Sequence, residues 1–188
     1  DNIMLKYKMT DNTLMVNGRV LHQIVALKDF SVIRKGDLGG WIEDYSNLSQ
    51  EGKAWVTNNA CVYAFAKVSM NAFVGGNARV AGKAVVTENA IVQNNAYIYG
   101  NAEVSGHAHV CSNAHIYGNA CVYGNAVIRG NAHIHGFASI YDLADVYDNA
   151  YVYDHACVSG DVLVCDNARI YDYGRVGLNA FVGGNAVV

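Results

Sequence analysis

The sequence contains no proline, little charge and no long apolar run. Charged residues make up 15% of the 188 residues and the formal net charge is −3. This argues against a nucleic-acid partner, because a phosphate backbone calls for a basic stripe. No stretch of about 18 apolar residues is present, so we expect no membrane-spanning helix. The opening DNIMLKYKMT lacks the apolar core of a signal peptide, and no long polar tract indicates a disordered linker.

A six-residue repeat dominates the rest of the chain. Steps of six from Ala54 to residue 186 give 23 hexads, and alanine occupies this marker position in all of them except Val162 and Gly174. The residue two places later is always valine or isoleucine, and asparagine precedes the marker in 14 hexads. One inserted residue would exchange inside and outside positions, so a phase held over this length is structural. Self-similarity at a fixed short period indicates a β-helix.

The stereochemistry of the hexad predicts which residues face inward. Alternate residues of a strand point the same way, so alanine and valine or isoleucine face the interior while the residues between them face outward. Glycine and asparagine tolerate left-handed backbone conformations and supply the corners. Three hexads form one 18-residue coil of a triangular prism. The sequence therefore predicts an all-β protein, a single-stranded parallel β-helix of nearly eight coils.

Residues 1–50 do not follow this phase, and we interpret them as a capping segment that precedes a β-helix over residues 51–188. Asn17-Gly18 lies between two apolar-rich runs, which predicts a β-hairpin. A cap would cover the open edge of the first coil, and Phe30, Trp41 and Ile42 are candidates for closing its core. No comparable segment follows the last hexad, so we expect the final coil to be uncapped.

The segment Gly36–Glu43, with the sequence GDLGGWIE, is not typical of solenoids in general. With the following Asn47-Leu48-Ser49 and the hexads, it resembles the YdcK-like β-solenoid proteins of enterobacteria and their phages, within the left-handed β-helix (hexapeptide-repeat) superfamily. The resemblance covers almost the whole chain and implies a left-handed coil, which spacing alone does not determine. Members of this family are often named as acyltransferases. Relatives in phages and prophages are compatible with a phage-encoded modulator of a host protein.

Steps of 18 residues sort the outward-facing side chains into columns on three faces. The first face is unusually apolar, and a large exposed apolar patch indicates an interface. His109 and Asp145 interrupt its apolar column, which we predict to be an oligomer face: Trp55, Phe73, Ile91, Val127, Leu163 and Phe181. The third face is mixed in composition, and we expect it to be plain solvent-exposed surface.

The second face stacks tyrosine and histidine at one coil spacing. Rigid amphipathic rings suit a recognition surface. They also stabilise a sheet as cross-strand neighbours, by about 0.2–1 kcal/mol per pair, without any partner. Both interpretations stay open at this point. The predicted partner-binding residues are Tyr97, Tyr99, His115, Tyr117, His133, His135, Tyr151, Tyr153 and Tyr171.

Three histidines of this face, His115, His133 and His135, fall close together in the predicted coils and are a candidate zinc site. Their spacing does not match that of the γ-class carbonic anhydrases, which also use a left-handed β-helix. We favour adventitious stacking of the three rings, and expect neither a metal nor a cofactor.

The five cysteines do not form a predicted disulfide framework. Cys121 and Cys157 share a column two coils apart, or roughly 9–10 Å at strand spacing, which exceeds the ~7 Å limit for a disulfide. Cys111 and Cys165 lie three coils apart. Unpaired cysteines without a signal sequence indicate a cytoplasmic location.

These features predict a non-enzymatic binding or scaffold protein. Its flat faces would dock on a protein partner or support self-association as a dimer or trimer. The first alternative, implied by the resemblance, is a trimeric acyltransferase using acetyl-CoA. Such enzymes interrupt their coils with a loop, whereas the hexads here run unbroken, and no acidic residue is evident to orient His107 or His109 as a base. The second alternative, suggested by the uncapped final coil, is a polymer-forming structural element.

Overall fold

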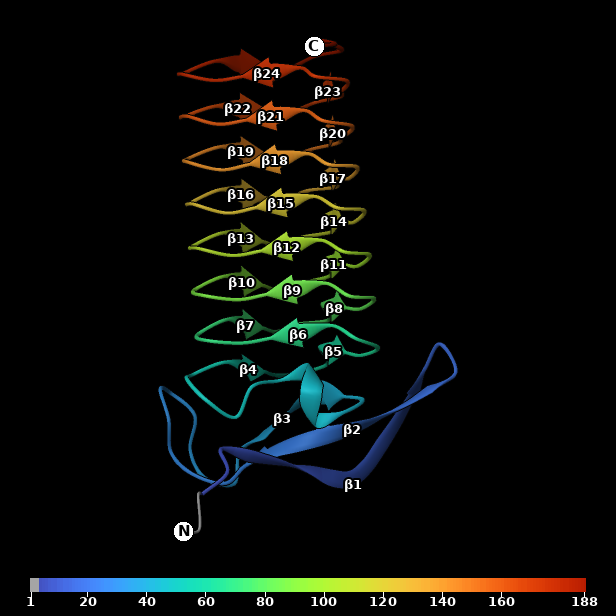
Figure 1. The fold of residues 1–188 in the computed structure, drawn as a ribbon, viewed down its shortest axis with the longest axis vertical. Coiled ribbons are helices and arrows are strands. Elements are labelled where there is room, and N and C mark those ends of the chain that lie inside the picture. Colours follow the sequence, from blue (N-terminus) through green and yellow to red (C-terminus); the bar gives the residue numbers. More distant parts are fainter. Residues whose placement is uncertain (1–3) are drawn as a thin grey trace.

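Each hexad folds into a two-residue strand and a four-residue turn, and three hexads complete one triangular coil (Figure 1). The computed structural model describes residues 4–188. In Figure 1 the front strands, such as β6 (Lys67–Val68), point left and the rear strands, such as β4 (Trp55–Val56), point right while the chain rises. This sense of rotation is left-handed. The predicted left-handed parallel β-helix with 18-residue coils is therefore confirmed.

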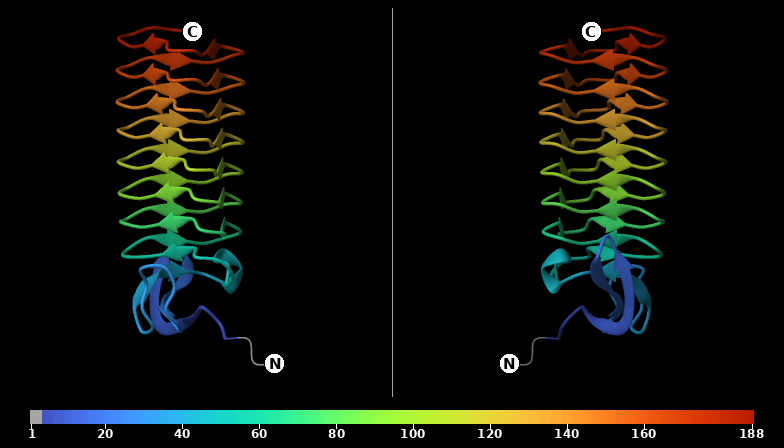
Figure 2. Two further views of the ribbon diagram at one scale, coloured as in Figure 1. Left: turned by 90° about the vertical axis from the view of Figure 1, so that its left-hand side faces the viewer. Right: turned by 90° about the vertical axis from the view of Figure 1, so that its right-hand side faces the viewer.

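Three parallel sheets form the sides of the prism (Figure 2). The first sheet contains β4, β7 (Phe73–Val74), β10 (Ile91–Val92), β13 (His109–Val110), β16 (Val127–Ile128), β19 (Asp145–Val146), β22 (Leu163–Val164) and β25 (Phe181–Val182). The second contains β5 (Cys61–Val62), β8 (Arg79–Val80), β11 (Tyr97–Ile98), β14 (His115–Ile116), β17 (His133–Ile134), β20 (Tyr151–Val152) and β23 (Arg169–Ile170). The third contains β6, β9 (Val85–Val86), β12 (Glu103–Val104), β15 (Cys121–Val122), β18 (Ser139–Ile140), β21 (Cys157–Val158) and β24 (Arg175–Val176).

The strands pair in the register that the hexads predict. Tyr97 lies opposite His115, and His115 opposite His133, so each residue faces the one 18 positions later. Inside the prism, the marker alanines and the valines or isoleucines form one continuous core, and from Ala54 to Ile170 all of them are at most 1% exposed. Every inward side chain is in contact with the coils above and below it. The narrow interior therefore suits alanine beside a branched side chain.

Left-handed residues form the corners. The residue two places before each marker has a positive φ, as at Gly118 (65°) and Asp154 (55°). Aspartate tolerates this conformation because its short side chain can bond to nearby backbone. Here it bonds to the next coil: Oδ2 of Asp154 accepts a hydrogen bond from the amide of Asp172 at 3.1 Å, and Oδ2 of Asp142 one from the amide of Gly160 at 2.9 Å.

The N-terminal segment extends the second sheet. β1 (Tyr7–Val16) and β2 (Arg19–Ala26) form the predicted hairpin, and β2 pairs antiparallel with β3 (Leu38–Ile42). β3 then pairs in parallel with β5. A 3-10 turn, η1 (Tyr45–Asn47), and a bridge from Leu48 to Val68 lead into the hexads. The parallel pairing thus begins within the capping segment, before the first hexad.

The cap closes the core over Trp55, whose indole is 1% exposed. The rings of Tyr7 and Phe30 meet it edge-on, with centroids at 6.3 and 5.3 Å. Lys6 Nζ donates to the carbonyl oxygen of Ala54 at 2.7 Å, and burial lowers the pKa of this lysine to about 8. Ile42 is buried in the core as predicted, and Phe30 packs against it.

Trp41 does not plug the core, contrary to the prediction. It lies opposite Cys61, an outward position, and packs on the outside of the second sheet with Tyr63. No helix within residues 4–188 is long and apolar enough to cross a membrane.

Shortening a side chain in the core should lower the free energy of unfolding in proportion to the volume removed. Ile134 is fully buried, so Ile134→Ala should lower the free energy of unfolding by about 2–5 kcal/mol and Ile134→Val by about 0.5–1.5 kcal/mol, measured by chemical denaturation. Equal, small losses in both variants would contradict tight packing of the prism interior.

Candidate functional site

The second sheet carries a continuous surface of stacked rings, which we call the aromatic wall: Tyr97, Tyr99, His115, Tyr117, His133, His135, Tyr151, Tyr153 and Tyr171. The strands β11, β14, β17 and β20 and the residues just after them, together with the residue after β23, supply these side chains at outward positions. One ladder runs Tyr99–Tyr117–His135–Tyr153–Tyr171, with centroids 4.8–5.3 Å apart and ring planes within 11° of parallel. The structure therefore brings together the residues predicted for the second face.

Stacking determines what the wall offers to a partner. The rings of the long ladder cover each other's faces, so their edges point outward with the phenol hydroxyls and imidazole nitrogens. Burial raises the pKa of Tyr99 and of Tyr117. A tyrosine hydroxyl both donates and accepts hydrogen bonds. The wall is thus amphipathic, with apolar ring bodies and hydrogen-bonding edges.

The second ladder, His115–His133–Tyr151, contains a poorly solvated imidazole. The ring of His133 lies 4.9 Å from that of His115 and 4.7 Å from that of Tyr151. Burial, and then the neighbouring His115 and His135, lower the pKa of His133, and burial lowers that of His135. Nδ1 of His133 is buried and has no hydrogen-bond partner within residues 4–188. Both imidazoles are therefore neutral at pH 7.

The candidate zinc ligands do not converge. Among the described residues, one group of three metal-ligating side chains has its ligand atoms within 4.8 Å of one another, and it is not His115, His133 and His135. The positions of these three rings are explained by stacking on one another and on the neighbouring tyrosines.

The chain's own hairpin covers the N-terminal part of the second sheet (Figures 1 and 2). Val16 and Leu21 pack on Tyr63 and Ala81, and Tyr97 and Tyr99 lie against this cluster. The side-chain amide of Asn17 donates to the Tyr63 hydroxyl at 3.2 Å, and that hydroxyl lies 3.5 Å from the hydroxyl of Tyr97.

Sequence reasoning missed this contact. The column Tyr63–Ala81–Tyr99 could have indicated it, because the small Ala81 interrupts the tyrosines and leaves space for aliphatic side chains. Tyr97 and Tyr99, predicted to bind a partner, thus contact the chain itself. The wall is free of the hairpin from His115 to Tyr171.

The apolar column of the first sheet is less continuous than predicted. Trp55 is buried under the cap and cannot contact a partner. Between the partly exposed Ile91 and Leu163, polar pairs intervene: Gln93 with His109 at 2.9 Å, and Arg129 with Asp145 at 2.9 and 3.0 Å. Phe73 and Val127 are partly buried, and Phe181 is 66% exposed.

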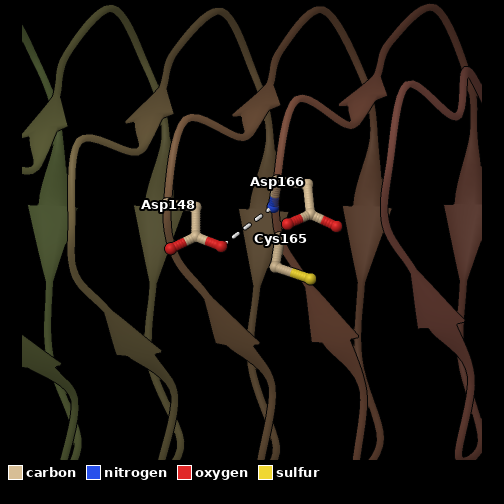
Figure 3. A group of neighbouring side chains, drawn as sticks. All are labelled: Asp148, Cys165 and Asp166. Atoms are coloured by element: carbon tan, nitrogen blue, oxygen red, sulfur yellow. Dashed lines mark hydrogen bonds between the residues drawn. The ribbon is translucent and has the colours of Figure 1, made fainter.

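Asp148, Cys165 and Asp166 are the one group with clustered ligand atoms in the described chain (Figure 3). Both carboxylates already bond to backbone: Asp148 accepts from the amide of Asp166 at 3.2 Å, and Asp166 from the amide of Gly184 at 2.8 Å. Cys165 is 3% exposed and hydrogen-bonds Tyr147, which raises the pKa of that tyrosine to about 12. These contacts assign the group a structural role at the corner.

Two hollows in the surface lie near the cap. One, of about 440 Å³, lies between the hairpin and the second sheet and is lined by residues that include Met15, Trp41 and Arg79. The other, of about 410 Å³, lies beside Ser49 and Met70 where the cap meets the third sheet. Neither adjoins the free part of the aromatic wall.

Comparison with known proteins supports the fold and the repeat. Residues 72–88 and 114–130 match the YdcK β-solenoid repeat. A protein of Escherichia coli K12 named as an uncharacterized acetyltransferase, YdcK, is 38% identical over 58 residues. This alignment covers 30% of the present chain and 18% of the relative's length. The resemblance to YdcK-like β-solenoids is confirmed at the level of the repeat.

The half-buried imidazole of His133 should make stability sensitive to acid. Because its folded-state pKa lies below that of the unfolded chain, stability is retained above about pH 6.5 and lost as pH falls through the lowered value. His133→Tyr keeps the ring stack and should lose less stability between about pH 7 and pH 5.5, followed by thermal denaturation. Tyr151→His adds an imidazole to the same ladder and should lose more. Identical acid sensitivity in both variants would contradict this account.

Proposed function

With YdcK-type β-solenoid repeats as its framework, we propose that this chain is a non-enzymatic binding protein whose aromatic wall docks on a protein partner. One observation carries the proposal: the same sheet already binds polypeptide, because the chain's own hairpin packs on Tyr63, Tyr97 and Tyr99. The wall continues beyond the hairpin with the same residue types.

The physical chemistry of the wall favours recognition. Tyrosine supplies a large contact area with few rotatable bonds, so little conformational entropy is lost on binding. The ladders restrict these side chains further, because each ring is held between its neighbours at about 5 Å. A partner therefore meets a preorganised surface, which lowers the entropic cost of association.

Self-association through this wall is a version of the same function. Tyrosine hydroxyls and neutral imidazoles each combine a donor and an acceptor, so two copies of the wall are chemically complementary. Light scattering over a range of concentrations distinguishes a second copy of the chain from a different protein as the occupant.

An acetyltransferase is the second candidate, favoured by the printed name of the E. coli relative. That name belongs to a protein of which the alignment covers 18%. From β4 to β25 the strands follow one another every six residues, so no loop projects from these coils to build a cleft. Acetyl-CoA binding, measured by thermal shift, together with a trimeric mass would favour the enzyme over the binding protein.

Introducing charge on the wall should abolish partner capture without unfolding the chain. We expect proteins captured from a lysate by the purified chain to be lost with Tyr117→Glu and with Tyr153→Asp, because a carboxylate replaces an amphipathic ring at the interface.

Tyr123→Glu is the matched control for this experiment. Tyr123 stacks on Tyr141 at 4.9 Å in the same manner, but on the third sheet. Capture should be unaffected in this variant. If the two wall variants retain capture, or if Tyr123→Glu loses it equally, the second sheet is not the binding face.

A further inference from the structure

We infer that the free part of the aromatic wall binds a polypeptide segment bearing arginine side chains. The inference rests on the proposed function and names the chemistry of the partner. Aspartates lie at the corners on either side of the second sheet. β20 is preceded by Asp148 and followed, after Tyr153, by Asp154. β23 is flanked in the same way, one coil later, by Asp166 and Asp172.

Three of these four aspartates are held in place by the next coil. Asp148, Asp154 and Asp166 each accept a hydrogen bond from a backbone amide through Oδ2. The two ion pairs within residues 4–188 are Arg19–Glu43 and Arg129–Asp145, and neither includes them. On the wall between the two acidic edges, the one basic side chain is Arg169. The surface therefore combines ring edges with unneutralised carboxylates.

The negative charge of the chain is concentrated in the part of the sequence that forms the free part of the aromatic wall. Residues 84–188 contain three arginines, no lysine and nine acidic residues, a formal charge of −6, whereas residues 1–83 carry +3. The acidic half is the half in which the wall is free of the hairpin. Complementary potential accelerates and selects the encounter with a cationic partner.

The chain itself shows how a guanidinium fits this chemistry. Arg169 lies over the ring of Tyr151 on the wall, with Cζ 5.0 Å from the centroid. On the neighbouring sheet, Arg129 lies 4.3 Å over the ring of Tyr147 and forms two hydrogen bonds to Asp145. Arginine thus lies over a tyrosine ring twice on these coils, and at Arg129 it also bonds to a carboxylate beside the ring. Arginine combines stacking with forked hydrogen bonding in a way that lysine does not.

Binding of a fluorescently labelled oligoarginine peptide to the full chain, measured by anisotropy near physiological ionic strength, tests the inference. We expect saturable binding, and none of an oligoglutamate peptide. The double variant Asp148→Asn with Asp154→Asn should weaken binding about three- to tenfold, since asparagine tolerates the left-handed turn and removes only the charge.

The matched control is Asp142→Asn with Asp161→Asn. It removes the same charge at the corner between the third and first sheets, where Asp142 caps Gly160 as Asp154 caps Asp172. Screening over about 8 Å confines the effect to nearby charges, so this variant should bind as the wild type does. Equal weakening by both double variants, no binding, or equal binding of oligoglutamate would overturn the inference.

A further variant separates this inference from the proposed function. If Tyr153→Ser abolishes peptide binding and the aspartate variants do not change it, the wall is a docking surface but its partner is not selected by charge, and the inference fails alone. If lysate capture also persists in Tyr117→Glu and Tyr153→Asp, the proposed function fails with it.

Discussion

The inward alternation of alanine with valine or isoleucine is the constraint on which the rest of this structure depends. Because the interior admits only these small and branched side chains, each coil must contain 18 residues and each outward side chain must lie directly above its counterpart in the previous coil. The core of the prism is thus also the device that organises its surface. Substituting an outward residue changes one position in a column without disturbing the register of the others.

This relation explains why so much of the fold was predictable. A period of six with an unbroken phase determines which residues face inward, which share a sheet and which are neighbours across coils, so the columns of the aromatic wall followed from counting alone. The hand of the coil did not follow from spacing and came from the resemblance to a family. Trp41 was misplaced because the cap does not obey the period: two extra residues before the first hexad offset Trp41 from Cys61 by 20 positions rather than 18. Trp55 has the predicted register, opposite Phe73, but the cap buries it.

The candidate site was predictable in its residues but not in its accessibility. Stepping through the sequence places Tyr97 and Tyr99 on the same face as Tyr153, yet it gives no information on the hairpin, which leaves the sheet and returns along its outer surface. That contact depends on a tertiary fit between Val16, Leu21 and the space above Ala81. The neutral state of His133 depends equally on stacking that no composition reveals. Together these contacts divide one face into a part occupied by the chain itself and a part available to a partner.

The most direct test of the account is hydroxyl-radical footprinting of the purified chain, alone and in complex with a partner captured by the wild-type protein. The account predicts that Tyr117, Tyr153 and Tyr171 become protected in the complex, while Tyr123 and Tyr141 on the third sheet are modified at unchanged rates. Protection of the third sheet, or of Ile91 and Leu163 on the first, with the wall still reactive, would show that the aromatic wall is not the working surface of this protein.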